Sequence, residues 1–346
     1  MPASDFARAL QQYLESSLGP LQSLRPVPGG GAQDAAVWHA IFASGKQIAV
    51  KKHVHAGAGE VEFGVLKMLH TLGAPVARPL QWDPHLGVLT SEWVGQRTLA
   101  AAISAANVSQ PRKEHALHTL AQSLLRGCAA LETACVGIAE RLPLRTTGEP
   151  QRRQAEVRER CRSAPETYLR FADHCNLAVP KGWTSALQAA WNVVTDSLCD
   201  GCLTFGGRDC TPRNVLTDGA QVWFLDFAVI GLDWPEARLA QYAAYLGANT
   251  PGILPLSLLT YGEERWYVES GCIDSAQLDM HHLVLWSEAA RLLLDGKLGT
   301  LPSQDRLLGQ RLRQALRLAL FPLACKTPAE PVRSLLATVF ANELTE

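Results

Sequence analysis

The sequence predicts an α+β protein in which a small antiparallel sheet precedes a larger, mainly helical part. Residues 21–94 alternate short apolar and β-branched runs with Gly and Pro turns, which is typical of strands. From about residue 96 onward the apolar residues recur at helical spacing instead. The 346 residues are 47% hydrophobic and only 19% charged, so the chain can bury a large core. We therefore expect two lobes, formed by residues 1–95 and residues 96–346.

Composition narrows the classes of function and location. A formal charge of −1 argues against nucleic acid as the main partner. The first residues lack the apolar core of a signal peptide, and no apolar run has the length of a transmembrane helix, so we expect a cytoplasmic protein. The nine cysteines are scattered along a long chain, which indicates reduced thiols and not a disulfide framework.

The first lobe is expected to begin with a helix, because Phe6, Leu10 and Leu14 recur at helical spacing. Three strands follow, with the sequences LQSLRPV, AAVWHAIFAS and QIAVKKHV. The turn between the first two contains a cluster of three glycines, residues 29–31. In the third strand, period-two alternation places Lys51 on the opposite face from Lys52.

A helix and two more strands complete this lobe. The stretch EVEFGVLKMLHTLG has apolar residues at helical spacing and ends at Gly73. The following stretch, ARPLQWDPHLGVLTSEWVG, predicts two strands joined at Asp83 and Pro84.

The stretch LTFGGRDCTPRNVLTDGAQVWFLDFA, residues 203–228, concentrates polar side chains between apolar runs. Two strands are expected, over 203–205 and over 222–227, with Arg208, Asp209 and Asn214 on the loop between them. Asp226 stands inside the second run, where an unpaired carboxylate would be costly. A metal ion or another cation is therefore expected beside Asp226.

The spacing from Asp209 to Asn214, followed by the LDF that contains Asp226, resembles the catalytic loop and metal site of the protein-kinase-like superfamily. Within that superfamily the loop looks most like the aminoglycoside phosphotransferase and choline kinase branch. The resemblance implies a two-lobed protein-kinase-like fold. It also implies that Asp209 takes the proton of an acceptor hydroxyl, that Arg208 organises the loop, and that Asn214 and Asp226 hold Mg²⁺.

The same resemblance implies where ATP binds. IAVK is similar to the strand motif whose lysine, here Lys51, contacts the phosphates and pairs with a helix glutamate, for which we prefer Glu62 over Glu60. The glycine cluster stands where such folds carry a loop over the phosphates. The strand GVLTSEWV runs out of the lobe as the hinge, which holds adenine through its backbone. The residues implied for these two roles are Gly29, Gly30, Gly31, Ser91, Glu92, Trp93 and Val94.

The sequence also departs from that branch at three positions. Gly207 replaces the usual histidine of the loop, and Ala228 replaces the glycine after DF. Arg238 occupies the position of an acid that braces the catalytic loop in related folds. Either Asp233 or Glu236 substitutes for that acid, or Arg238 takes part in a different network.

The predicted function is transfer of the ATP γ-phosphate to a small-molecule hydroxyl, and the acceptor stays open. A protein kinase is a weaker alternative, because only residues 228–232 separate LDF from DWPEARLA and leave no room for an activation segment. A lipopolysaccharide-core sugar kinase is another alternative, since the arginine-rich stretch QRRQAEVRERCR could meet an anionic glycolipid, although a solvated helix face with a Glu156 to Arg160 pair is preferred. A catalytically inactive nucleotide-binding regulator is the alternative from a different class.

Overall fold

The structure of the protein is a computed structural model that describes residues 3–27, 35–108, 113–139, 149–174, 203–245, 252–253 and 275–296. The chain forms two compact units. The first unit comprises Met1–Ala102, Arg126–Leu142 and Phe205–Gly231, and the second comprises Ile103–Leu125, Pro143–Thr204 and Leu232–Glu346. The predicted α+β class is confirmed. The lobe boundary after residue 95 stays a prediction.

The described elements follow the predicted order, with strands first and helices dominating later. They are α1 (Ala3–Leu18), β1 (Leu21–Pro26), β2 (Ala35–Phe42), β3 (Gln47–His53), α2 (Ala56–Thr71), β4 (Pro79–Asp83), β5 (Val88–Glu92), α3 (Leu99–Val108), α4 (Lys113–Ala139), α5 (Glu149–His174), β6 (Thr204–Gly207), η1 (Pro212–Asn214), β7 (Val215–Thr217), β8 (Val222–Phe224), β9 (Ile230–Asp233), α7 (Pro235–Ala243), β10 (Ala244–Tyr245), β11 (Gly252–Ile253) and α10 (Ser275–Leu294).

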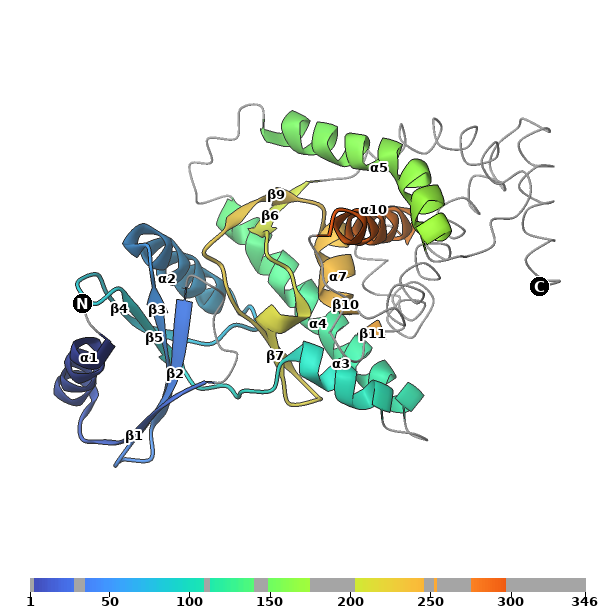
Figure 1. The fold of residues 1–346 in the computed structure, drawn as a ribbon. Helices are drawn as coiled ribbons and strands as arrows, with labels where there is room; N and C mark the ends of the chain where they lie inside the picture. Colours follow the sequence, from blue (N-terminus) through green and yellow to red (C-terminus); the bar gives the residue numbers. More distant parts are fainter. Residues whose placement is uncertain are drawn as a thin grey trace, which may run out of the picture. The chain divides into compact units, whose positions relative to one another are not determined.

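The first unit is built on a five-stranded antiparallel sheet in the order β1-β2-β3-β5-β4 (Figure 1). The three predicted strands form β1, β2 and β3, and the two strands joined at Asp83 and Pro84 form β4 and β5. Strand β3 lies in the middle of the sheet, where Lys51 pairs with Val37 on one side and Leu89 on the other. A residue on this strand is therefore held firmly by neighbours on both edges.

Helix α1 covers one face of this sheet, as its helical spacing predicted. Phe6, Leu10 and Leu14 are buried and belong to one apolar cluster with sheet residues such as Ile48 and Val50. The helix ends at Leu18, and the following Gly19 adopts a positive φ of 98°, a conformation that glycine reaches at little cost.

Helix α2 packs against the sheet and begins earlier than predicted, so that Gly57 and Gly59 lie in its first turns. A glycine is required at position 59 because a Cβ atom there would lie only 2.3 Å from the ring of Trp82 and 2.9 Å from that of His53. This close approach lets the helix settle onto β3 and β4. It also brings Glu62, one turn further along, down to the sheet.

Two short pairs of strands follow within residues 204–233. Strands β7 and β8 form an antiparallel hairpin in which Val215 is paired with Phe224, and β6 is paired with β9. The hairpin is anchored in the first unit, since the Phe224 N–H donates to Pro75 O at 2.9 Å. Its buried side chains approach α4 at Gly127, where a Cβ atom would lie 2.2 Å from Val222.

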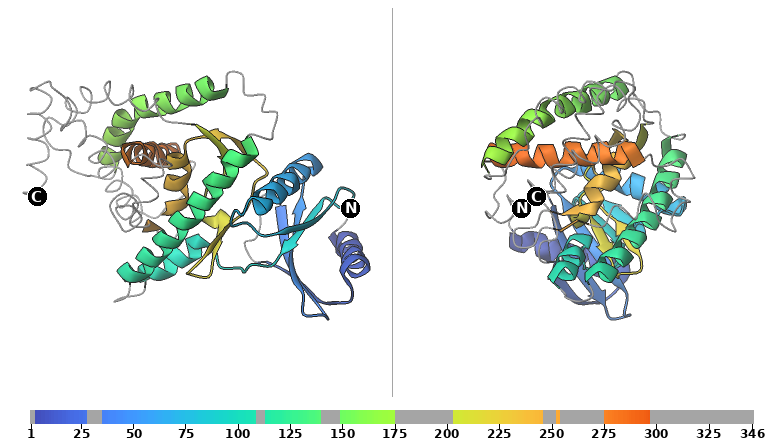
Figure 2. Two further views of the ribbon diagram at one scale, coloured as in Figure 1. Left: turned by 180° about the vertical axis from the view of Figure 1, so that it is seen from behind. Right: turned by 90° about the vertical axis from the view of Figure 1, so that its right-hand side faces the viewer.

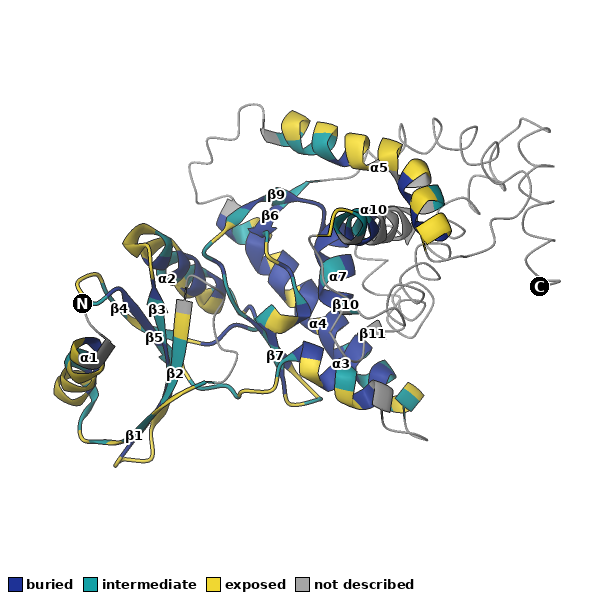
Figure 3. Ribbon diagram, in the orientation of Figure 1, coloured by how far each residue is buried: buried dark blue, intermediate teal, exposed yellow. Residues whose placement is uncertain are grey.

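In the second unit, α5 and α10 lie side by side, and α7 packs against α10 (Figure 2). Helix α5 buries Val157, Phe171 and Ala172 but leaves much of its opposite face exposed (Figure 3). No helix among the described residues combines the length and the apolar character that a membrane crossing requires.

The arginines of α5 differ from expectation. Glu156 pairs with Arg152 at 3.9 Å and with Arg153 at 3.1 Å, and the expected pair with Arg160 is not the one formed. The cause is that Arg153 is drawn inward by the buried Asp233, at 2.8 Å, and carries Glu156 with it. The arginine-rich stretch is therefore only partly a solvated face.

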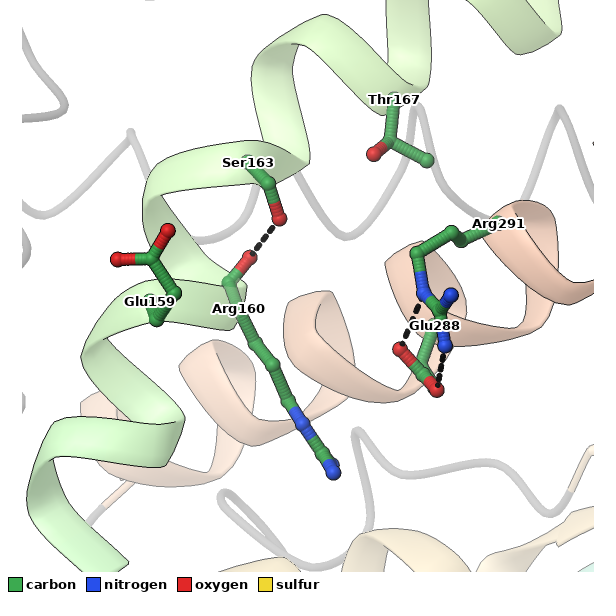
Figure 4. A pocket seen from close by; sticks show the side chains of 6 residues that line it. All are labelled: Glu159, Arg160, Ser163, Thr167, Glu288 and Arg291. Atoms are coloured by element: carbon green, nitrogen blue, oxygen red, sulfur yellow. Dashed lines mark hydrogen bonds and ion pairs between the residues drawn. The ribbon is translucent and has the colours of Figure 1, made fainter. Parts of the chain in front are cut away.

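A polar depression opens between α5 and α10 (Figure 4). Its main charges are already neutralised, since Arg291 donates to Glu288 through Nε at 3.0 Å and Nη2 at 2.6 Å, and to Asp295 through Nη1 at 3.0 Å. These exposed ion pairs lie within α10 and its C-terminal end, so they contribute little to the packing of α5 against α10. The lining residues are Glu159, Arg160, Ser163, Thr167, Glu288 and Arg291.

The packing of α2 gives a first prediction, on stability. Gly59→Ala should lower the free energy of unfolding by about 1–3 kcal/mol, because the methyl group would overlap the Trp82 ring. The matched control is Gly64→Ala in the same helix, where no atom lies within 4 Å of the added carbon. That change should stabilise the protein by about 0.5–1 kcal/mol. Urea unfolding of both variants checks the pair, and equal effects would contradict the close approach.

Candidate active site

Lys51 and Lys52 face opposite sides of the sheet, as the alternation in β3 predicted. The Lys52 ammonium lies 3.6 Å from the centre of the Phe6 ring on α1. Lys51 points the other way, toward α2. The two neighbouring lysines thus have different partners, and only Lys51 meets carboxylates that are far away in the sequence.

The Lys51 ammonium binds three carboxylate oxygens. Its Nζ donates to both oxygens of Glu62, at 3.0 and 2.8 Å, and to Asp226 Oδ1 at 2.9 Å. An ammonium group has three donors, so this set of acceptors uses all of them. The predicted ion pair with Glu62 is confirmed, and the cation expected beside Asp226 is Lys51. Glu60, the rejected candidate, is exposed.

Glu62 is almost fully buried and has a second neighbour, because His53 Nε2 lies 2.9 Å from its Oε2. Burial alone would raise the pKa of Glu62, but His53 and Lys51 outweigh it and lower that pKa. Burial would likewise lower the pKa of Lys51, yet the carboxylates of Glu62 and Asp226 raise it. The pair therefore stays charged over a wide range of pH. The sequence reading missed His53, although alternation from Lys51 places it on the same face.

The loop between β6 and β7 holds Asp209 and Asn214 together. The single turn of η1 begins at Pro212 and ends at Asn214, whose backbone N–H donates to Thr211 O at 2.9 Å. The Asn214 Nδ2 then donates to both the backbone O and the Oδ2 of Asp209, each at 3.0 Å. Because both partners are acceptors, the amide nitrogen must face Asp209. The amide oxygen of Asn214 is therefore turned away from Asp209.

The register of the β7–β8 hairpin brings Asn214 close to the LDF residues. Val215 is paired with Phe224, and the Leu225 N–H donates to Asn214 O at 2.8 Å. The expected strand over 222–227 was too long, since β8 ends at Phe224. The reason is that Asp226 has a φ of 65°, which takes the chain out of the sheet. This turn points the Asp226 carboxylate at Lys51 instead of into an apolar layer.

Asn214 and Asp226 fit a magnesium ion that is shared with a nucleotide. Carboxylate and amide oxygens are ligands that Mg²⁺ accepts, and it commonly takes only one or two carboxylates plus substrate phosphates. The Asn214 Oδ1 accepts no hydrogen bond from a described residue, and Asp226 offers Oδ2 beside the oxygen bound to Lys51. Among the described residues no cluster of three or more His, Cys, Asp or Glu side chains forms a closed metal site.

The four residues implied for adenine binding differ in what their backbones can offer. Ser91 and Glu92 lie inside β5, and the Glu92 N–H already donates to Arg78 O at 2.9 Å. The Trp93 N–H donates to Gln47 O at 3.4 Å, and its ring stacks on His39 with centroids 3.8 Å apart. Val94 is the first residue after β5 whose N–H has no backbone acceptor in the described chain. Adenine binding by this segment stays a prediction.

Arg208 and Gly207 lie at the start of the catalytic-loop stretch, whereas the glycine cluster is not described. Arg208 is half-buried, and its backbone N–H donates to Val229 O at 3.1 Å, which closes the base of the loop. Gly207 packs beside the Phe227 ring, and a Cβ atom there would make an ordinary contact at 3.5 Å. Gly29, Gly30 and Gly31 lie outside the described residues.

Comparison with known proteins gives similarities at the level of structure. No protein-family model and no curated protein matches the chain. A choline/ethanolamine kinase family protein from Mesorhizobium loti is 16% identical with a TM-score of 0.44 over 96% of this chain and 99% of that one. The choline kinase LicA from Streptococcus pneumoniae is 13% identical with a TM-score of 0.44 over 90% and 99%. The ADP-bound aminoglycoside phosphotransferase APH(2'')-Ib is 9% identical with a TM-score of 0.48 over 93% and 100%.

These structures belong to the classes that the loop residues resemble.

The buried ion pair gives a second prediction. Lys51→Met should lower the free energy of unfolding by about 3 kcal/mol, because the Glu62 charge then stays buried without its main counter-ion. The double variant Lys51→Met with Glu62→Leu should lose much less than the sum of the two single losses. A urea unfolding cycle measures the coupling.

The neighbouring residues supply matched controls for this cycle. Lys52→Met removes only a contact with the Phe6 ring and should cost no more than about 1 kcal/mol. Glu60→Leu changes an exposed carboxylate of the same helix and should change stability by about 0.5 kcal/mol or less. Additive losses at Lys51 and Glu62, or a larger loss at Lys52 than at Lys51, would mean that the pair is not coupled as the geometry requires.

Proposed function

We propose that this protein transfers the γ-phosphate of ATP to a hydroxyl group of a small molecule, with Mg²⁺ as the metal. The observation that carries the proposal is a continuous set of contacts within the first unit. Lys51 binds Asp226, the residue before Asp226 is bonded to Asn214, and Asn214 binds Asp209. A phosphate-binding cation, two metal ligands and a carboxylate base are thus adjacent in one row.

Phosphoryl transfer depends mainly on positioning and on neutralising negative charge, and each member of the row has a part in that. Lys51, held by Glu62, would bind the phosphates. Asp226 and Asn214 would hold the metal, which screens the charge of the transferred group and of the leaving ADP. Asp209 would accept the acceptor's hydroxyl proton as the new O–P bond forms and the bond to the β-phosphate oxygen breaks.

The exposure of Asp209 suits this role. It is exposed, whereas its neighbour Cys210 is buried and donates to Gly207 O at 3.2 Å. The buried cysteine fixes the loop from inside and leaves the carboxylate of Asp209 accessible to an acceptor. The hydrogen bond from Asn214 holds one of its oxygens and leaves the other available for the acceptor hydroxyl.

The chain after the LDF residues supports a small acceptor over a peptide. Strand β9 begins at Ile230, only three residues after Phe227, and α7 begins at Pro235. No described segment between them could serve as the long activation segment on which protein kinases dock peptides. A small-molecule acceptor needs no such platform.

The anionic glycolipid acceptor has little support from the charges of α5. Arg152 and Arg153 pair with Glu156, Arg162 pairs with Glu159, and Arg153 is also bound to the buried Asp233. An arginine that is already paired contributes less to an anionic surface. Action in the cytoplasm on a small hydroxylated molecule is the simpler form of the proposal.

The decisive experiment is a screen of hydroxylated metabolites, antibiotics and sugar lipids for ATP-dependent phosphorylation, read by mass spectrometry. Incorporation of phosphate into one compound supports the proposal and identifies the acceptor. Binding of Mg·ATP without turnover on any acceptor class would favour the inactive regulator instead. Failure to bind Mg·ATP at all would overturn the proposal.

The third prediction concerns the base. Asp209→Ala should lower turnover by about 10²–10⁴-fold, the usual contribution of a positioned base. Its dissociation constant for Mg·ATP should stay within about twofold of the wild-type value, because Asp209 meets the acceptor and not the nucleotide. Isothermal calorimetry and steady-state kinetics check the two parts.

Asp218 supplies the control for this variant. It is an exposed carboxylate on the β7–β8 turn and accepts backbone bonds from Ala220 and Gln221 at 2.9 and 2.8 Å. Asp218→Ala should leave turnover within about twofold. Wild-type turnover in Asp209→Ala would remove Asp209 from the mechanism.

The fourth prediction separates the two metal ligands. Asp226→Asn should weaken Mg-dependent ATP binding more than Asn214→Ala does, because a carboxylate neutralises the metal and an amide only donates a lone pair. Asp226 also binds Lys51, so the affinity for ATP is measured for each variant with and without Mg²⁺. The gain in affinity that Mg²⁺ gives is then compared between the variants and the wild type. If both variants keep the wild-type difference, the metal is held elsewhere.

A further inference from the structure

Arg238 is one of the most deeply buried charged side chains among the described residues. It lies on α7 with 2% of its surface exposed. A buried guanidinium is costly unless its donors find acceptors. Two of its nitrogens find acceptors at the ends of two strands. Nη1 donates to Thr204 O at 3.4 Å and to Asp233 O at 3.3 Å, and Nη2 donates to Thr204 Oγ1.

The Asp233 carboxylate binds a second arginine, Arg153. This carboxylate is buried and receives Arg153 through Nε at 3.3 Å and Nη2 at 2.8 Å. The Trp234 N–H also donates to Asp233 Oδ1, at 3.0 Å. The Asp233 side chain is thus occupied by Arg153, and Arg238 uses the backbone carbonyl of the same residue. Arg238 thus takes part in a network with Thr204 and Asp233, as one of the alternatives left open by the sequence expected.

His281 adds no further charge to this network at neutral pH. Its ring lies beside Trp234, with centroids 5.1 Å apart, and burial, opposed by Asp233 and aided by Arg153 and Arg238, lowers its pKa to about 4. The imidazole is therefore neutral above that value. The geometry of the network is set by the two arginines and their acceptors.

The acceptors of Arg238 lie at the start of one strand and at the end of its paired strand. Thr204 is the first residue of β6, and Asp233 is the last residue of β9. These two strands are paired, and the segment between them, residues 205–231, contains Asp209, Asn214 and Asp226. One side chain thus joins the entry and the exit of the segment that carries the proposed base and both proposed metal ligands.

We propose that Arg238 is a positioning residue, whose guanidinium fixes the two ends of the 205–231 segment and thereby the placement of Asp209. Only the kinetic part of this inference rests on the proposed function. The planar guanidinium presents several N–H groups in a fixed fork, so it spans Thr204 and Asp233 at once. A lysine at this position keeps the charge but has a single nitrogen in place of the fork, so it cannot reproduce the bonds that Nη1 and Nη2 make together.

The test uses two substitutions that act on the same contact from opposite sides. Thr204→Val removes the hydroxyl acceptor with almost no change of shape, and Arg238→Lys removes the fork while keeping the charge. Hydrogen exchange is followed in peptides covering residues 205–217, where the Arg208 N–H bond to Val229 reports the closure of the segment. Steady-state kinetics on the same preparations separate kcat from the KM for ATP.

Both variants should exchange amides of this segment at least about tenfold faster and lose at least about tenfold in kcat, with the KM for ATP within about twofold. The double variant should lose no more than the larger single loss, since the bond to the Thr204 hydroxyl that Thr204→Val removes is also lost in Arg238→Lys. Thr90→Val is the control. It removes the bond that the buried Thr90 hydroxyl on β5 donates to Gln81 O on β4 at 3.2 Å, and should leave exchange of residues 205–217 unchanged.

Unchanged exchange in Thr204→Val would overturn the proposal, and this variant decides the question even if Arg238→Lys fails to fold. A rise in exchange spread equally over the whole chain would also overturn it, because that outcome marks general destabilisation. If the wild-type protein transfers no phosphate, the proposed function fails, and localised exchange still decides whether Arg238 holds the segment.

Discussion

The charge balance at the Lys51 ammonium is the interaction on which the proposed site depends. Its three carboxylate oxygens come from Glu62, 11 residues away on α2, and from Asp226, 175 residues away after β8. A sheet strand, a helix and the end of a hairpin therefore meet at a single nitrogen. Because Glu62 is buried, β3 and α2 cannot move apart without leaving its charge unpaired, which is expensive in a protein interior. The fit of α2 at Gly59 and the anchoring of β8 at Pro75 serve this one meeting point.

Local sequence patterns, together with the resemblance to kinase-like motifs, predicted much of this arrangement. Period-two alternation separated Lys51 from Lys52, and the burial of Glu62 against the exposure of Glu60 agrees with the choice between the two glutamates. The spacing of Asp209 and Asn214 predicted a loop that keeps them together. Each of these inferences concerns residues within one element or one short loop. At that range the period of a strand or a helix decides which side chains share a face.

The parts that the sequence left open depend on partners far along the chain. Arg153 sits in a stretch that reads as a solvated helix face, and nothing near it in the sequence reveals that Asp233, 80 residues later, is its buried partner. Arg238 binds Thr204, 34 residues earlier, through a hydroxyl that carries no special signal. Asp226 seemed to lie within a strand because its neighbours are apolar, and only the hairpin register ends β8 at Phe224. Such pairings follow from the tertiary fold, and no single-sequence periodicity encodes them.

The backbone of Asp226 sets this position in conflict with the stability of the fold. It is the one non-glycine residue with a positive φ among the described residues, at 65°. That conformation costs most side chains free energy, whereas glycine adopts it freely and asparagine and aspartate tolerate it as single residues. Glycine at this position would relax the backbone but would also remove the Asp226 oxygen that binds Lys51, so its two effects on stability oppose each other. Sequences drifting without demand for the chemistry should lose their aspartate at this turn before they lose the apolar core beneath it.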